Sequence, residues 1–205
     1  GAAISSPAVE QINQAVGFAE RLRDLSNESG AQRLADASEA CFSGSEIVRQ
    51  IEGRLDRLQQ ADQNKPDLQT FINREFVPAF DRVREVSRTG YWNAGLRFDT
   101  DISIDQKTLS PSDFGFHNAL RMADGHLWFI DFEYAGWDDV AKLICDFTCQ
   151  PERPVTVKQA RQFGKKVVEN LSNNPGIKPE NIFITITENH DIDFSFRDGI
   201  AQFVV

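Results

Sequence analysis

Two aspartates and an asparagine stand at spacings that could carry phosphoryl transfer. Asp113 and Asn118 share one loop, and Asp131 follows a stretch with the pattern of a β-hairpin. A carboxylate beside an attacking hydroxyl can orient it and accept its proton. Carboxylate and amide oxygens can hold Mg²⁺ on the phosphates of ATP. Because the hairpin would return Asp131 to the side of Asn118, these three residues are candidates for one Mg²⁺- and ATP-dependent site.

The same stretch resembles the aminoglycoside phosphotransferase and choline kinase family. The resemblance rests on Asp-x-x-x-x-Asn at 113–118 and on Ile-Asp-Phe-Glu-Tyr-Ala-Gly-Trp-Asp-Asp at 130–139, and it covers roughly residues 8–154. It implies that Asp113 is the catalytic base. It also implies that Asn118 and Asp131 bind Mg²⁺ and ATP, with Glu133 as an auxiliary metal or substrate group. The implied substrate is a hydroxyl group of a small, often cationic molecule.

Three further features near the motif receive their own interpretation. Pro111 stands where that family usually carries a His before the catalytic Asp, and we interpret this form as a subfamily variant. His117 is expected to pack or to bond the backbone, not to act in catalysis. By the same resemblance, Asp138 and Asp139 brace the loop beside them. An isolated Asp-x-x-x-x-Asn is common, but the ordered set with a hairpin inside it favours the kinase interpretation.

The sequence before Asp113 shows no recognisable nucleotide-binding N-terminal lobe of a kinase. A Gly-rich loop and a strand Lys should precede the catalytic loop. Gly44 and Gly53 instead fall within or next to helical patterns, and Lys65 precedes a Pro. We therefore expect the N-lobe to be absent, Mg·ATP binding to be weak, and the isolated chain to be inactive. The alternative is a non-catalytic remnant or binding module, and an upstream reading frame encoding the missing lobe would favour the enzyme.

The tail, about residues 155–205, resembles the C-terminal half of a tautomerase-superfamily protein. The likeness rests on residues 176–189, which end in a strand pattern, and on the aromatic-Ser-Phe segment that runs to Ala-Gln within 193–202. Phe194 stands where Trp is usual, and Arg197 where the first Gly is usual. The alternative for the tail alone is a β-hairpin cap on the kinase-like lobe.

The tautomerase family uses an N-terminal Pro as its base, and this chain starts with Gly1. Pro151 and Pro154 are internal tertiary amides and cannot replace that base. We therefore expect the tail alone not to tautomerise a substrate. For the whole chain, a tautomerase-related fusion fragment is a further alternative.

Apolar residues at helical spacing predict the elements that would position these motifs. Helices are expected over about 8–25, from Ser43 or Ser45 to a break at 64–66, over about 68–86 with a kink at Pro78, and over 140–147 and 156–171. Strands are expected at 119–122, 127–130, 181–187 and 201–205. The predicted apolar helix faces include Val9, Ile12, Val16, Ala19, Leu22, Ile47, Val48, Ile51, Leu55, Leu58, Phe71, Phe76, Phe80 and Val83.

The predicted fold class is α+β. Residues 1–154 are expected to form the helical C-terminal lobe of a protein-kinase-like fold with a small catalytic β-hairpin. Residues 155–205 are expected to form a short β-α-β-like tail, with no kinase N-lobe in the chain.

Composition limits the class of partner. The net charge is −9, from 31 acidic and 22 basic residues, which argues against a nucleic-acid partner and is compatible with a cationic substrate. No apolar run approaches the roughly 20 residues that span a bilayer, so we expect no membrane partner. Three cysteines without Cys-x-x-Cys spacing indicate no disulfide framework and no structural zinc. Buried thiols and a cytoplasmic location are expected.

Overall fold

The structure is a computed structural model that describes residues 2–3, 7–61, 65–171, 184–187, 193–197 and 200–204. These residues belong to two compact units, one formed by the chain up to Ala40 together with the chain from Ile102, and the other by Cys41–Asp101. The predicted boundary between residues 154 and 155 remains a prediction.

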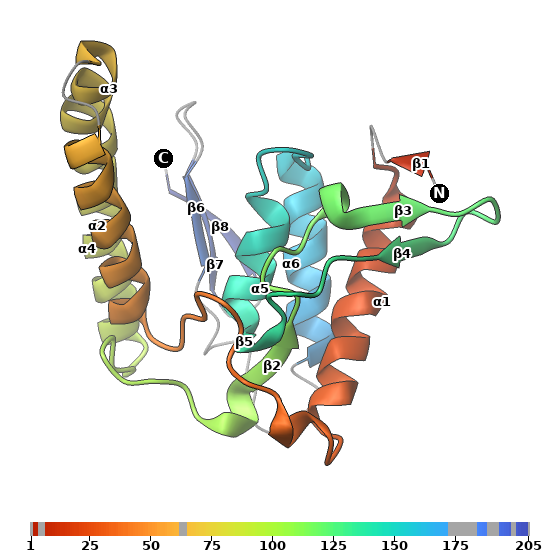
Figure 1. The fold of residues 1–205 in the computed structure, drawn as a ribbon. Helices are drawn as coiled ribbons and strands as arrows, with labels where there is room; N and C mark the ends of the chain where they lie inside the picture. Colours follow the sequence, from red (N-terminus) through yellow and green to blue (C-terminus); the bar gives the residue numbers. More distant parts are fainter. Residues whose placement is uncertain are drawn as a thin grey trace. The chain divides into compact units, whose positions relative to one another are not determined.

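The first unit combines three helices with short antiparallel strands (Figure 1). Its helices are α1 (Val9–Ser26), α5 (Val140–Thr148) and α6 (Val157–Leu171), with single 3₁₀ turns η1 (Ala31–Arg33), η3 (Ile104–Gln106) and η4 (Phe116–Asn118). Its strands are β1 (Ala2–Ala3), β2 (Lys107–Ser110), β3 (Ala119–Arg121), β4 (Leu127–Phe129), β5 (Gly136–Asp139), β6 (Ile184–Thr187), β7 (Asp193–Arg197) and β8 (Ile200–Val204).

The strands form three small antiparallel sheets, ordered β1-β3-β4, β2-β5 and β6-β7-β8. In the β3–β4 hairpin Ala119 lies opposite Phe129. In the β2–β5 pair Leu109 lies opposite Trp137. The first two sheets carry the loops that hold Asp113 and Asp131, because β2 and β3 flank one loop and β4 and β5 flank the other.

The core of the first unit forms where the apolar faces of α1, α5 and α6 meet the Asp113 loop. Its buried residues include Ile12, Ala15, Val16, Ala19, Phe114, Phe116, Val140, Leu143, Ile144, Phe147, Ala160, Phe163, Val167 and Val168. The rings of Phe147 and Phe163 stack with centroids 4.1 Å apart, and Phe114 lies 5.0 Å from Phe147. The aromatic cluster thus attaches the loop directly to two helices.

The second unit is helical, with α2 (Gly44–Ala61), α3 (Pro66–Phe71) and α4 (Val77–Asn93). A π-helical turn, η2 (Ile72–Phe76), separates α3 from α4. Pro78 stands in the first turn of α4 and has no N–H to donate to the preceding turn, which explains why the helix widens just before it. The predicted kink at Pro78 is thus seen as a local change of helix type.

The structure confirms a mixed α+β fold, together with the predicted hairpin and the helices at 140–147 and 156–171. Some predicted core positions are wrong: large exposed apolar side chains include Val9, Ile47, Leu58, Phe71 and Phe76. These residues follow a helical period, but a period specifies only a shared face of the helix, and how far that face is buried depends on packing against other elements. That residues 1–154 form a kinase-type C-terminal lobe remains a prediction.

The expected β-α-β order of the tail is wrong for the described residues. There α6 is followed by β6, β7 and β8, and both strand pairs are antiparallel. The physical reason is the short links, since parallel neighbours need a crossover of a dozen or more residues. Residues 176–183 and 188–192, which carry part of the tautomerase-like pattern, lie outside the described residues.

None of the three cysteines forms a disulfide bond among the described residues. Cys41 is buried and Cys145 partly buried, but Cys149 is exposed, so the expectation of buried thiols is wrong for Cys149. Within the described ranges, no helix combines the length and the apolar composition that crossing a bilayer requires.

Candidate active site

The loop after β2 presents Asp113 at the surface because its neighbours are anchored. Phe114 and Phe116 are buried in the core, while Asp113 keeps 50% of its side chain exposed. Ser112 adopts a positive φ of 69° and donates its N–H to Ser110 Oγ at 3.1 Å. A positive φ on a residue other than Gly costs roughly 1–2 kcal/mol and is often found at functional sites. The loop is therefore held in one conformation with its carboxylate facing outward.

Three side chains fix the carboxylate of Asp113. Asn118 Nδ2 donates to Oδ2 at 3.3 Å, and Gln150 Nε2 donates to Oδ1 at 3.2 Å. His117 Nε2 lies 3.1 Å from Oδ2. The same nitrogen lies 3.3 Å from Gln150 Nε2, and a neutral imidazole can donate to Oδ2 only with its proton on Nε2. With donors on both oxygens, the orientation of the carboxylate is set.

His117 is only 8% exposed, which agrees with the prediction of a packing residue. Its hydrogen bond goes to a side chain, however, and not to the backbone. A Cβ built on Gly115 would lie 2.7 Å from His117 Nδ1, so only a Gly lets the ring approach this closely. No local pattern in the sequence indicated Gln150, because it lies beyond α5, far from the loop along the chain.

The β3–β4 hairpin brings Asp131 beside Asn118, as predicted. Ile130 donates its N–H to the Asn118 carbonyl at 3.0 Å, and Asp131 comes next in the chain. Asp131 has a φ of 66°, a conformation that Asp tolerates better than most residues. Its carboxylate is exposed and makes no hydrogen bond or ion pair within the described ranges. Asp131 is thus free to bind a ligand.

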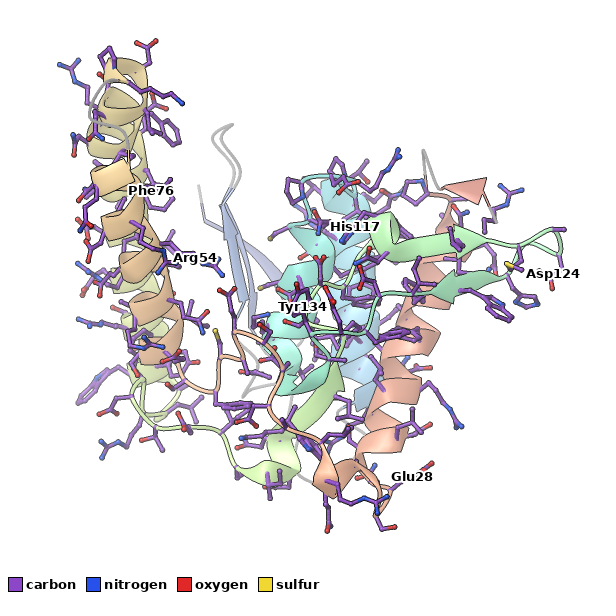
Figure 2. All side chains as sticks on the ribbon, in the orientation of Figure 1. Glu28, Arg54, Phe76, His117, Asp124 and Tyr134 are labelled. Atoms are coloured by element: carbon purple, nitrogen blue, oxygen red, sulfur yellow. The ribbon has the colours of Figure 1, made fainter. Side chains whose placement is uncertain are left out.

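Tyr134 shows that the acidic groups share one surface. Its hydroxyl donates to the carboxylate of Glu133, and this bond raises the pKa of Tyr134. The charge of Glu133, burial, and the charges of Asp131 and Asp113 raise that pKa further. The negative charges of Asp113, Asp131 and Glu133 therefore all act on the Tyr134 hydroxyl. Figure 2 shows His117 and Tyr134 on this part of the unit, with Asp124 away from them at the hairpin tip.

Few side chains in this part of the structure could bind a metal cation. Among the described residues no group of three or more His, Cys, Asp or Glu side chains is placed to hold a metal ion. Asn118 directs its amide nitrogen to Asp113, which leaves its oxygen as a ligand, and Asp131 offers a carboxylate. Mg²⁺ is typically held by one or two protein groups together with waters and substrate phosphates. Asn118 and Asp131 fit that requirement.

The segment Ala35–Ser38 ties the two loops of the site together. Ser38 accepts a bond from Ser112 Oγ at 2.6 Å through its carbonyl and donates its N–H to the Tyr134 carbonyl at 3.0 Å. Trp137 donates its N–H to the Ala35 carbonyl at 3.0 Å. One short segment thus links the Asp113 loop to the loop that follows Asp131, and the sequence alone did not reveal it.

Gly136 permits this link, and replacing it with Ala should disrupt the link. A Cβ on Gly136 would lie 2.4 Å from the Ala35 carbonyl oxygen and 2.6 Å from the Ala37 nitrogen. Because both are backbone atoms, the segment would have to move.

Gly136→Ala should lower the free energy of unfolding by about 1–3 kcal/mol in urea denaturation. Gly17→Ala is the control: with no atom near the new methyl group, it should raise stability by about 0.5–1 kcal/mol. Equal stability for Gly136→Ala and the unaltered protein would contradict this role.

Asp138 and Asp139 are the last residues of β5 and immediately precede α5. Asp139 caps the helix by accepting from the Ala141 N–H at 2.9 Å. Asp138 is fully buried, accepts from the Asp139 N–H at 2.8 Å and lies 3.4 Å from Lys142 Nζ. Lys142 also pairs with Asp146 at 2.7 Å. The acidic pair thus braces the start of α5.

Asp139→Asn should change how stability depends on pH. Burial raises the pKa of Asp139 to about 6, the bond from Ala141 opposes the rise, and the charge of Asp138 adds to it. The folded state therefore holds this proton more tightly than the unfolded chain, so this group lowers stability as pH rises from 3.8 to about 6. Asn keeps the cap acceptor and removes the charge. The variant should gain about 1 kcal/mol at pH 7 and show a flatter pH profile in chemical denaturation.

Asp139→Ala serves as the comparison because it removes charge and cap together. It should be about 1 kcal/mol less stable than Asp139→Asn at pH 7. An Asn variant with an unchanged pH profile would contradict the raised pKa.

A protein-family model described as "Tautomerase enzyme" matches residues 115–197, which is less than half of the chain. The match supports the predicted tautomerase-like character of the tail and begins within the Asp113–Asn118 loop. No curated protein matches the chain. The resemblance of residues 8–154 to the aminoglycoside phosphotransferase and choline kinase family remains a prediction.

Proposed function

We propose that this chain provides the acceptor and magnesium side of a phosphotransferase, which moves the γ-phosphoryl group of ATP to a hydroxyl of a small, cationic molecule. The proposal rests mainly on the contact of Asn118 Nδ2 with the Asp113 carboxylate at 3.3 Å. In addition, the β3–β4 hairpin brings Asp131 beside Asn118. A base and two oxygen ligands thus come from two adjacent loops on one exposed surface.

Asp113 is the proposed base. Its carboxylate is half exposed, and donors from His117, Asn118 and Gln150 hold it in one orientation. A substrate hydroxyl at this carboxylate would be oriented by a hydrogen bond and would transfer its proton there as the new O–P bond forms. Positioning of this kind supplies most of the catalysis in phosphoryl transfer.

Asn118 and Asp131 are the groups that would hold Mg²⁺, through one amide oxygen and one carboxylate. The bound ion would neutralise charge on the phosphates of ATP. Glu133 remains a proposed auxiliary group, although its carboxylate is engaged by the Tyr134 hydroxyl. The gathered carboxylates also favour a cationic acceptor such as an aminoglycoside or choline, because nothing basic within the described ranges pairs with Asp131.

Metal binding tests the proposal without requiring turnover. Mn²⁺ with ATP, added to the ¹⁵N-labelled chain, should broaden the amide signals of Asn118, Ile130 and Asp131 first. Asp131→Asn should remove the selective broadening. Asp124→Asn is the matched control, since Asp124 lies at the tip of the same hairpin and accepts only the His126 N–H at 3.0 Å. Broadening centred elsewhere, or retained in Asp131→Asn, would overturn the proposed site.

The family match favours a second candidate, tautomerase-type proton transfer by the tail. The ultraviolet absorbance of an enolisable 2-oxo acid distinguishes the two functions, because tautomerisation changes its conjugation. A rate above the uncatalysed one that is unaffected by Asp113→Ala would favour the tautomerase interpretation. We expect no such rate, since Pro151 and Pro154 are internal tertiary amides.

A further inference from the structure

The end of α4 reverses the chain in a way that builds a pocket in the second unit. Gly95 has a φ of 68°, donates its N–H to the Trp92 carbonyl at 3.0 Å, and is followed by Leu96, which donates to the Tyr91 carbonyl at 2.9 Å. These two bonds form a Schellman motif, which needs a left-handed residue at this position. The residues after Gly95 therefore fold back along the last turns of α4.

Phe98 is the fixed wall of the pocket that results. Its carbonyl accepts from the Ser45 N–H at 3.0 Å at the start of α2. Its ring meets Tyr91 edge-on at 5.2 Å and lies so close to Gly44 that a Cβ there would be 2.3 Å from it. The Arg88 guanidinium lies over the same ring at 5.5 Å. Tyr91, Gly44 and Arg88 thus lie against the ring, and Ser45 binds the backbone of Phe98, before any ligand arrives.

The pocket between the helix and the returning segment has a volume of about 510 Å³. This is within the range of roughly 300–1,000 Å³ that is usual for small-molecule sites. Its aromatic lining comes from Tyr91, Trp92 and Phe98, and Trp92 is 83% exposed. So large an exposed indole beside a fixed ring offers a face on which a planar ligand can stack.

The charges of the pocket favour an anion. Arg97 is paired with Asp99 at 3.1 Å, so these two charges offset each other. Arg88 has no ion-pair partner within the described ranges and leaves one positive charge at the wall. In a chain with a net charge of −9, a locally positive aromatic pocket is an exception. A guanidinium placed over an aromatic ring can still bind a carboxylate through its planar fork of N–H donors.

We propose that this pocket binds a planar aromatic ring that carries one carboxylate. The ring stacks on Trp92 and the carboxylate pairs with Arg88. The inference rests only on residues of the second unit and is independent of the proposed phosphotransferase site.

Calorimetric titration of the whole chain with 2-naphthoate tests the proposal. Saturable binding at one site is expected, with 2-naphthamide and cyclohexanecarboxylate each binding at least about tenfold more weakly because they lack the charge or the aromatic ring. Arg88→Gln and Trp92→Leu should each weaken naphthoate binding by about tenfold. Arg88→Lys should weaken it less, since the charge remains and only the planar fork is lost.

The controls are Arg82→Gln, an exposed Arg on the same helix, and Trp128→Leu, an exposed Trp of the first unit. Both should bind naphthoate as the unaltered protein does. The proposal is overturned by absent binding, by equal binding of naphthamide, or by unchanged binding in both Arg88→Gln and Trp92→Leu. Circular dichroism confirms folding, which Arg88→Gln and Trp92→Leu should retain because both side chains are exposed.

Discussion

Replacing Asp113 with Ala should lower the rate of phosphoryl transfer by about 10²–10⁴-fold. The proposed function makes Asp113 the group that orients and deprotonates the acceptor hydroxyl, whereas Mg²⁺ would be held by Asn118 and Asp131. Mg·ATP binding should therefore change little. The measurement is steady-state transfer to an aminoglycoside or choline, made on the longest product of the reading frame that contains this sequence.

Asp131→Ala should behave differently, and the difference is the test. It should weaken Mg·ATP binding as well as transfer, because it removes a proposed metal ligand. Asp124→Ala, at the far end of the hairpin, should alter neither (Figure 2). Turnover close to normal in Asp113→Ala would exclude it as the base. Asp113→Ala should also lose about 1–2 kcal/mol of stability, since the mostly buried His117 loses one of its two side-chain contacts.

Replacing Lys142 with Met should lower the free energy of unfolding at pH 7 by about 3–5 kcal/mol. Lys142 is only 15% exposed and lies between fully buried Asp138, at 3.4 Å, and Asp146, at 2.7 Å. Without the ammonium group, two desolvated carboxylates would face each other unpaired. Urea denaturation followed by circular dichroism would measure the loss.

The stability lost in Lys142→Met should be smaller at lower pH. Burial raises the pKa of Asp146 to about 6, and the charge of Lys142 is the main influence that lowers it. In Lys142→Met that pKa rises further, so the folded state binds a proton more tightly than the unfolded chain and is more stable at pH 5 than at pH 7. Adding Asp146→Asn to Lys142→Met should recover part of the lost stability at pH 7. A loss that is equal at both pH values, with no recovery in the double variant, would contradict the network.

The local sequence was sufficient to predict those elements whose conformation is decided by neighbouring residues. The tight Asp124-Gly125 turn between apolar runs predicts the β3–β4 hairpin, and the hairpin by itself brings Asp131 beside Asn118. The apolar spacing of 140–147 likewise predicts α5. Such patterns act over a few residues, where turn chemistry and side-chain periodicity decide the conformation.

Contacts between distant segments could not be predicted in this way. Gln150 reaches Asp113 only because α5 packs against the loop through Phe147 and Phe114. Ser38 connects two loops far away in the chain because Gly136 has no side chain to prevent the approach of its backbone. No local period encodes either contact.

The sequence by itself therefore determined the hairpin and which residues are candidates for the base and for the two cation ligands, because residue type and short spacing are local properties. Only the tertiary structure decided which groups orient Asp113, which residues brace α5, and how Phe98 closes against α4. Those features depend on packing and on close backbone approach between segments that are separate in the chain. The direction of β6, β7 and β8 was also decided by pairing between strands, which a period of two along each strand does not specify.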